Sequence, residues 1–293
     1  MKMALKPVSL TLVLSKVNTK KIFKMNTEKK EKKVRDIVAK KSLGQNFLED
    51  NNYKRKILNS SCDLYSNYSN LKLVEIGAGK GDLTLEYLKI NKELIIYEID
   101  TSLITTLKQK FPDNTIINCD FMTVIPDLEY SFLVSNLPYY IGSRLIVELI
   151  INNKQFPFAF ILQKEVANKT KKTNDITFFG SIINLFYDAK VEFLIPPSAF
   201  YPAPKVYSAL LTTRPKDQAK KQFEGAKSVY ILKKMFFKPN KTLYNNLIFG
   251  GLEKVVVDQL FESTNWDKNT RTNWTNYLDN FVNIYNFLTK SNN

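Results

Sequence analysis

Short apolar runs alternate with amphipathic segments along the middle of the chain. The runs have the length of buried strands, and the segments between them, such as DLTLEYLKI and TSLITTLKQKF, carry apolar residues at helical spacing. This repetition predicts an α/β fold with a parallel, Rossmann-like sheet covered on both faces. The expected strands are KLVEI (72–76), ELIIYEI (93–99), NTIINC (114–119), SFLVSN (131–136) and FPFAFIL (156–162), with AKVEFLI (189–195) and SALLTT (208–213) as a closing pair.

The pattern changes after Arg214-Pro215, where the charged stretch KDQAKKQFEGAK begins. From Ser228 onward the apolar spacing is helical, in VYILKKMFF, TLYNNLIF, VVVDQLFE and WTNYLDNFVNIYNFL. The chain is therefore expected to contain a catalytic domain over residues 35–214 and a small all-helical domain over residues 215–293, joined by a linker near 214–224.

Residues 1–34 form a basic extension without an acid before Glu28, and they are expected to be disordered. Two alternatives remain open: an over-extended start with initiation at Met25, or an organelle-targeting segment. Transit peptides favour Arg, and none occurs before Arg35. The expected location is the bacterial cytoplasm, or an organelle if this extension is a transit peptide.

The amino-acid composition limits the kinds of active site and partner that this protein can have. The chain has 43 Lys and Arg against 28 Asp and Glu, a net charge of +15, which suits a nucleic-acid partner but also a generally basic proteome. Histidine is absent, which excludes Ser-His-Asp triads, Cys-His dyads and His-ligated metals. Cys62 and Cys119 lie far apart and suggest neither a disulfide framework nor a zinc site. No apolar run approaches a membrane span.

A glycine-rich loop, Glu75-Ile76-Gly77-Ala78-Gly79-Lys80-Gly81, follows the first expected strand. It lacks the third glycine of the dinucleotide fingerprint, and G-x-G-x-G after an acid suits S-adenosylmethionine (SAM) better. Glu98 ends the second strand, where such folds place an acid on ribose hydroxyls, and Asp120 ends the third, suited to an adenine amino group. We therefore expect SAM at these three strand ends, and no metal.

The stretch Asn136-Leu137-Pro138-Tyr139 ends the fourth strand beside that expected cofactor crevice. An exocyclic amine is a poor nucleophile, and a neutral amide oxygen with a backbone carbonyl can accept both of its hydrogens without a general base. Pro138 fixes the turn, and Tyr139 offers a face on which an extruded base can lie. The pattern favours methylation of an amino group.

From about Lys40 to the C-terminus the chain resembles the ribosomal RNA adenine dimethyltransferase family of the KsgA type. The motifs that carry the resemblance are LGQNFL (43–48), EIGAGKG (75–81), YEID (97–100), CDF (119–121), NLPYY (136–140), LQKEVA (162–167), PPSAFYPAPKVYSALL (196–211) and NKTLYNNL (240–247).

The resemblance implies roles for individual residues. Asn136 and Leu137 would hold the target N6, while Tyr139 and Phe200 would sandwich the adenine. The implied cofactor-binding residues are Gln45, Asn46, Leu48, Gly77, Gly79, Glu98, Asp120 and Asn136. Apart from these implied roles, basic residues of this chain are expected to bind RNA, namely Lys205, Lys233, Lys234, Lys238 and Lys241.

The implied activity is dimethylation of N6 of two adjacent adenosines near the 3′ end of small-subunit rRNA, by a monomer that acts on the pre-ribosomal small subunit. Two departures, Pro239-Asn240 in place of an Arg pair and Ser181 in place of Arg, would weaken phosphate contacts. Two alternatives stay open: a macrolide-resistance methylase of large-subunit rRNA, and a non-catalytic nucleic-acid-binding paralogue like the mitochondrial transcription factors B.

Overall fold

The computed structural model describes residues 46–173, 176–273 and 275–290, and it divides them into two compact units with a boundary after Gly225. The basic extension (1–34) and Gln45 lie outside the described residues, so the expectations for them stay predictions.

The unit that ends at Gly225 is built on a seven-stranded sheet of order β4-β3-β2-β5-β6-β9-β7. Strands β4, β3, β2, β5 and β6 pair in parallel, and β9 pairs antiparallel with both β6 and β7. A short ribbon pairs β1 (Phe47–Leu48) with β8 (Phe200–Tyr201). The strands of the sheet are β2 (Lys72–Ile76), β3 (Ile95–Glu98), β4 (Ile116–Asn118), β5 (Ser131–Asn136), β6 (Phe158–Gln163), β7 (Tyr187–Ile195) and β9 (Ser208–Pro215).

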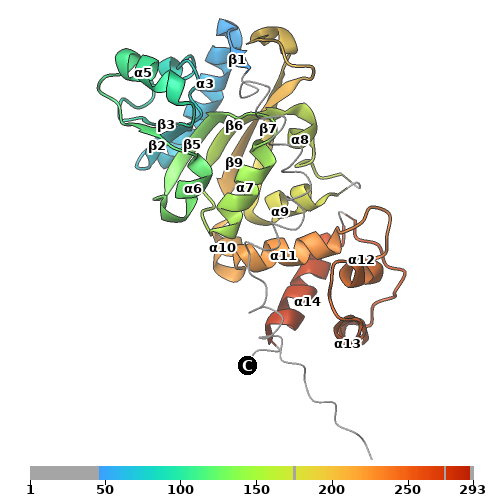
Figure 1. Cartoon of the computed structure of the whole chain (residues 1–293). Coiled ribbons are helices and arrows are strands. Elements are labelled where there is room, and N and C mark those ends of the chain that lie inside the picture. Colours follow the sequence, from blue (N-terminus) through green and yellow to red (C-terminus); the bar gives the residue numbers. More distant parts are fainter. Residues whose placement is uncertain (1–45, 174–175, 274, 291–293) are drawn as a thin grey trace, which may run out of the picture. The chain divides into compact units, whose positions relative to one another are not determined.

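Helices cover both faces of this sheet (Figure 1). On one face, α3 (Asn51–Tyr65), α4 (Thr84–Tyr87) and α5 (Thr101–Lys110) share a buried apolar cluster with inward residues of the strands, among them Leu73, Ile96 and Phe132. The other helices of the unit are α6 (Phe121–Val124), α7 (Gly142–Ile151), α8 (Lys164–Asn168), α9 (Phe178–Phe186) and α10 (Asp217–Gln222), with 3₁₀ turns at Ser66–Tyr68, Ile125–Asp127 and Pro197–Ala199.

The expected Rossmann-like sheet is confirmed. Each apolar run predicted as a strand overlaps one, and the closing pair is present as antiparallel β9 and β7. The chain runs outward through β2, β3 and β4 and then returns to place β5 beside β2. Such a reversal opens a crevice at the carboxyl ends of the strands, which is where ligands bind in this kind of sheet.

The expectation of a linker near residues 214–224 is wrong. Strand β9 continues to Pro215, and α10 follows at once, with Ala219 and Phe223 buried. The amide of Lys216 donates to the carbonyl of Phe186 over 2.8 Å, and Nζ of Lys220 donates to the carbonyl of Gln155. A charged sequence thus conceals a packed helix, because Ala219 and Phe223 are buried and the stem of Lys220 lies along the protein on its way to a backbone carbonyl.

The second unit is helical, as the sequence predicts. It comprises α11 (Gly225–Met235), which starts at the boundary, α12 (Leu243–Phe249), α13 (Lys254–Thr264) and α14 (Tyr277–Lys290). Leu247, Leu260 and Phe281 are fully buried in it. In neither unit do the described residues include a helix long and apolar enough to cross a membrane.

Candidate active site

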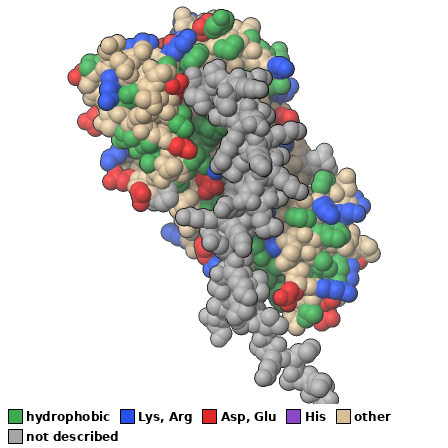
Figure 2. Space-filling model, viewed as in Figure 1, with side chains coloured by type: hydrophobic (Ala, Val, Ile, Leu, Met, Phe, Trp, Pro, Cys, Tyr) green, Lys and Arg blue, Asp and Glu red, His purple; other side chains and the backbone are tan. Residues whose placement is uncertain are grey.

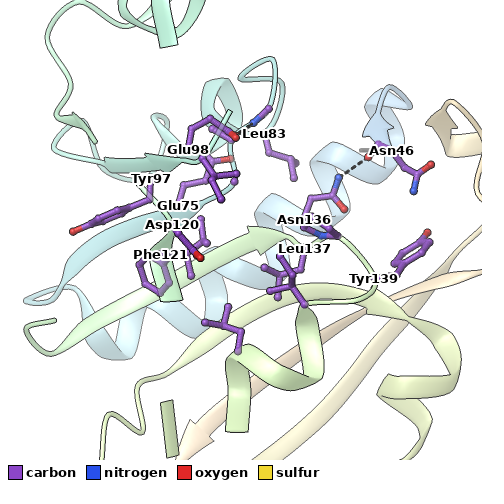
Figure 3. A pocket seen from close by; sticks show the side chains of 18 of the residues that line it. Asn46, Glu75, Leu83, Tyr97, Glu98, Asp120, Phe121, Asn136, Leu137 and Tyr139 are labelled. Carbon is purple, nitrogen blue, oxygen red and sulfur yellow. Dashed lines mark hydrogen bonds between the residues drawn. The ribbon is translucent and has the colours of Figure 1, made fainter. Parts of the chain in front are cut away.

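A cavity lies at the carboxyl ends of β2, β3, β4 and β5, across the point where the strand order reverses. Its empty space, including the part open to solvent, is about 1090 Å³. Glu75, Glu98 and Asp120 lie on one side of it, Asn46 and Tyr139 lie on the other, and Asn136 lies between (Figure 3).

The glycine loop after β2 has a backbone conformation that residues with a side chain rarely adopt. Gly77 and Gly79 have φ values of +70° and +59°, in the left-handed region. The amide of Gly79 donates to Oε2 of Glu98 over 2.8 Å, and the amide of Asp100 donates to the other oxygen over 2.9 Å. Glu98 therefore holds the loop against β3 from a position that is only 2% exposed.

Glu75 is a site residue that the sequence interpretation left out of its cofactor set. It lines the cavity, is 2% exposed, and accepts a hydrogen bond from the Thr84 hydroxyl over 2.7 Å. Burial raises its pKa to about 7, and the nearby carboxylate of Glu98 adds to the rise. A group with this pKa is close to half-ionised at neutral pH, unlike an ordinary carboxylate.

Asp120 caps helix α6. Its Oδ1 accepts from the amide of Met122 over 3.0 Å, and its carboxylate borders the cavity. The cap fixes the side chain at the end of β4, where the sequence placed it. Residues beside the predicted acids also line the cavity, namely Ile99, Phe121 and Met122. Ile99 and Phe121 lie in the motifs YEID and CDF, but no role was assigned to them, and Met122 had only its position shortly after a strand as a signal.

Asn136 ends β5, and its Nδ2 donates to the backbone carbonyl of Asn46 over 2.8 Å (Figure 3). A carbonyl can only accept, so the amide nitrogen must face Asn46 and the amide oxygen must face the other way. Leu48 follows in β1 with 1% of its surface exposed. The structure thus brings Asn46 and Asn136 together, as the sequence predicted for one site, while Leu48 anchors the segment in the core.

The turn after Asn136 orients Tyr139. The amide of Ile141 donates to the carbonyl of Pro138 over 2.9 Å, which closes the turn, and Leu137 is buried beneath it. The hydroxyl of Tyr139 lies 2.8 Å from Oγ of Ser208 on β9. Because both ends of the side chain are fixed, its ring is held at the cavity. The next residue, Tyr140, also lines the cavity and is 57% exposed, a second aromatic that the sequence interpretation did not use.

Phe200 does not join Tyr139 at the cavity. It is 4% exposed and belongs to the apolar cluster beneath the sheet, and it is not among the residues that line the cavity. Pairing of β8 with β1 turns this ring inward and its neighbour Tyr201 outward, because successive side chains on a strand point to opposite faces. The expected sandwich of Tyr139 and Phe200 is thus not formed in this structure.

The expected RNA-binding lysines differ in their surroundings. Lys205, Lys238 and Lys241 are exposed, and Lys233 is half-buried. Lys234 is 7% exposed, donates to the carbonyl of Gly250, and lies 4.3 Å from the ring centre of Tyr230. Burial lowers its pKa to about 8. This placement argues against the expectation that Lys234 binds RNA, because the ammonium group is directed inward to the end of α12.

The two sequence departures differ in their surroundings. Ser181 is fully buried in α9, and its hydroxyl donates to the carbonyl of Phe178 over 2.8 Å. The expectation that loss of an Arg at this position weakens phosphate binding stays a prediction. Asn240, at the other departure, has a left-handed backbone with φ +62°.

The net charge of +15 does not describe the folded units well. Lysines and Arg35 far outnumber Glu28, Glu31 and Asp36 in residues 1–45, so much of the basic excess lies outside the described residues. On the face in view, Lys and Arg side chains are scattered among acidic and polar ones (Figure 2). Charge alone therefore identifies no single RNA-binding face there.

Fold and site together define the class: a Rossmann-like methyltransferase domain. Two solved structures share the fold. A dimethyladenosine transferase from Plasmodium falciparum has a TM-score of 0.66 at 19% identity, over 84% of this chain and 98% of that one. The 23S rRNA methyltransferase ErmE has a TM-score of 0.59 at 20% identity, over 83% of this chain and 100% of that one.

The chain belongs to the ribosomal RNA adenine dimethylase family, whose model matches residues 37–290. Among its relatives, the protein named ribosomal RNA small subunit methyltransferase A in Helicobacter hepaticus is 34% identical over 87% of this chain and 93% of that protein. The protein of the same name in Campylobacter hominis is 36% identical over 82% of this chain and 93% of that protein. These relatives favour the small-subunit interpretation over both alternatives.

Proposed function

We propose that this protein transfers methyl groups from SAM to N6 of two adjacent adenosines near the 3′ end of small-subunit rRNA, and that it acts during assembly of the small subunit. Family membership and the names of the relatives support the reaction class and the substrate. The observation that carries the proposal in this chain is the orientation of the Asn136 amide beside the cavity.

The cavity residues fit SAM as the donor. A Cβ at Gly77 would meet no protein atom within 4 Å, so the glycine leaves space for a ligand that approaches the loop closely. The carboxylates of Glu98 and Asp120 suit ribose hydroxyls and an adenine amino group, and Ile99, Phe121 and Met122 offer apolar contact to a ring. When bound, SAM supplies an electrophilic methyl group on a positively charged sulfur.

Asn136 and Leu137 act on the amino group of the target. Because Nδ2 of Asn136 is engaged by Asn46, its Oδ1 is the atom that remains to accept an N–H hydrogen, and the Leu137 carbonyl accepts the other. Two such acceptors favour a tetrahedral nitrogen whose lone pair is withdrawn from the ring. Positioning then replaces a general base, which suits a chain without histidine.

Tyr139 supports the plane of the base. Its hydroxyl is held by Ser208, so the ring keeps one orientation and offers a stacking face to an adenine taken out of its helix. Phe200 would reach the other face only after a rearrangement of the β1–β8 ribbon.

The test is transfer of labelled methyl from SAM to small ribosomal subunits that lack these methyl groups, with large-subunit RNA in a parallel reaction. Mass spectrometry of the digested RNA is expected to find dimethyladenosine in the small subunit with wild type and with Asn152→Ala, an amide at the far end of α7. Asn136→Ala is expected to lose it. Label only in large-subunit RNA contradicts the proposed substrate, and no label with either RNA contradicts the proposed reaction.

A further inference from the structure

Two exposed aromatic residues lie in a segment whose ends adjoin residues that line the cavity. They lie in the segment 201–207, YPAPKVY, which joins β8 to β9 and is called the rim segment here. Tyr201 is 64% exposed, Tyr207 is 48% exposed, and Val206 is 44% exposed. Large apolar side chains this accessible within one short segment indicate a contact surface.

Both ends of the rim segment are tied to residues of the active site. Tyr201 stands opposite Phe47 in the β1–β8 ribbon, and Phe47 lines the cavity. Ser208, immediately after Tyr207, holds the hydroxyl of Tyr139 over 2.8 Å. The segment therefore runs from the Asn46 side of the cavity to the Tyr139 side, along its mouth.

Basic side chains accompany these rings. The amide of Lys164 donates to the carbonyl of Tyr207 over 2.9 Å, and its Nζ lies 5.8 Å from the centre of that ring. Lys205 is exposed within the segment itself. The acidic neighbour Glu165 is paired with Lys169 over 3.2 Å, so it leaves the charge of Lys164 uncompensated.

Aromatic faces interleaved with lysines have the chemistry of a surface for single-stranded nucleic acid. The rings stack on bases, and the ammonium groups attract the phosphates between them. A purely apolar protein partner would leave Lys164 and Lys205 desolvated without a counter-charge, which is costly. The surface therefore favours RNA.

We propose that the rim segment and Lys164 bind the unpaired nucleotide next to the target adenosine, with its base stacked on Tyr201 or Tyr207. The proposal rests on the proposed function and deepens it. Stacking depends on a flat ring and not on an N–H pattern, so the surface accepts adenosine equally before and after its N6 is methylated. One of two adjacent adenosines can thus be held outside the cavity while the other reacts.

The experiment compares KM for unmethylated small subunits among wild type, Tyr201→Ala, Tyr207→Ala and the matched Tyr201→Phe and Tyr207→Phe variants. Each loss of a ring is expected to raise KM about tenfold, within the range measured for single stacking contacts. The Phe variants are expected to stay within about twofold of wild type. The Kd for SAM, measured by calorimetry, is expected to be the same in all five, which also shows that the variants are folded.

Tyr130→Ala provides the control for loss of an exposed tyrosine. Tyr130 is 42% exposed and precedes the amino end of β5, whereas the cavity lies at the carboxyl ends. Its KM is expected to match wild type. If wild type methylates the subunits and both Ala variants keep its KM, or if the Phe variants lose as much as the Ala variants, the rim proposal is overturned while the proposed function stands. No transfer by wild type overturns both.

Ultraviolet crosslinking of the wild-type complex with small subunits separates the two kinds of partner. Nucleotide adducts on residues 201–207 are expected, at a position next to a target adenosine. Adducts of the same residues with a ribosomal protein would overturn the proposal in favour of a protein contact.

Discussion

Nδ2 of Asn136 lies 2.8 Å from the carbonyl oxygen of Asn46, a residue 90 positions earlier in the chain. This single bond fixes which end of the amide faces the cavity. It also ties the segment before β1 to the end of β5, so the wall of the site depends on a residue that is proposed to act in the reaction.

Replacement of Asn136 by Asp tests both consequences. A carboxylate retains acceptor oxygens, but it cannot donate to the Asn46 carbonyl and would repel it. We expect Asn136→Asp to lose at least about 100-fold in kcat/KM, comparable to removal of a positioned polar group in other active sites. Limited proteolysis is expected to cut the chain near Asn46 faster than in wild type. Equal cleavage rates would show that the bond does not hold this segment.

Replacement by alanine is expected to affect ligand binding at one glycine of the loop, Gly77, and protein stability at another, Gly81. Both have a positive φ, +70° at Gly77 and +81° at Gly81, so both substitutions carry backbone strain of about 1–2 kcal/mol. A Cβ at Gly77 meets no protein atom, whereas a Cβ at Gly81 would lie 2.5 Å from the Phe111 ring.

Gly77→Ala is therefore expected to weaken SAM binding with a small change in Tm, because its methyl group occupies ligand space. Gly81→Ala is expected to lower Tm much more, because a buried ring must move. Calorimetric titration with SAM and thermal melting measure the two effects. Equal loss of affinity in both variants, after correction for the unfolded fraction, would contradict the assignment of the open space at Gly77 to the ligand.

Glu75 makes the free energy of unfolding depend on pH. Its pKa is about 7 in the folded state and near 4.5 when unfolded. Between these values the unfolded chain releases the proton first, so this residue lowers stability as the pH rises from about 4.5 to 7, on the order of 3 kcal/mol in full. Glu75→Gln removes the titration and is expected to flatten the pH profile.

Urea unfolding from pH 4.5 to 8 measures that profile, with the exposed Glu93→Gln as the control. The Gln variant is expected to gain stability relative to wild type above pH 7 and to show little difference near pH 4.5. A wild-type profile with the same slope as that of Glu75→Gln would contradict the raised pKa.

Lys234 and Lys241 are expected to separate stability from RNA binding. Lys234→Ala removes the bond to the Gly250 carbonyl and the contact with Tyr230, at a cost of about 1–3 kcal/mol in unfolding free energy. Lys241 is exposed, and Lys241→Ala is expected to leave Tm unchanged.

The readout for RNA is the slope of log K against log salt. Lys241→Ala is expected to reduce the magnitude of that slope by about one, as for loss of one phosphate contact, and Lys234→Ala is expected to leave it unchanged. A reduced slope for Lys234→Ala at a temperature where it is fully folded would restore Lys234 to the RNA-binding set.

The sequence was informative wherever one physical rule dominated. The run 131–136 predicted β5 to the residue, because its apolar centre Phe132-Leu133-Val134 is typical of a strand buried on both faces and polar residues flank it. The sequence also predicted part of the cavity lining, because Gly77, Glu98 and Asp120 lie at the ends of consecutive strands.

The errors arose where tertiary packing decides. Whether the Phe200 ring faces in or out depends on its pairing with a strand about 150 residues away, which no local pattern records. In the sequence, Lys234 cannot be distinguished from the exposed Lys238. It is the packing of α11 against the end of α12 that buries its ammonium group. Helix α10 was not predicted, because two apolar residues among lysines are a weak periodic signal.

The two-stranded ribbon of β1 and β8 connects the cavity proposed for SAM with the rim segment proposed for RNA. Phe47 faces the cofactor cavity, and its partner Tyr201 begins the rim segment proposed to hold RNA. A shift of one strand must be transmitted to the other through their shared hydrogen bonds. Arrival of the donor is thus expected to change the affinity for RNA, and by thermodynamic reciprocity bound RNA must change the affinity for the donor by the same factor.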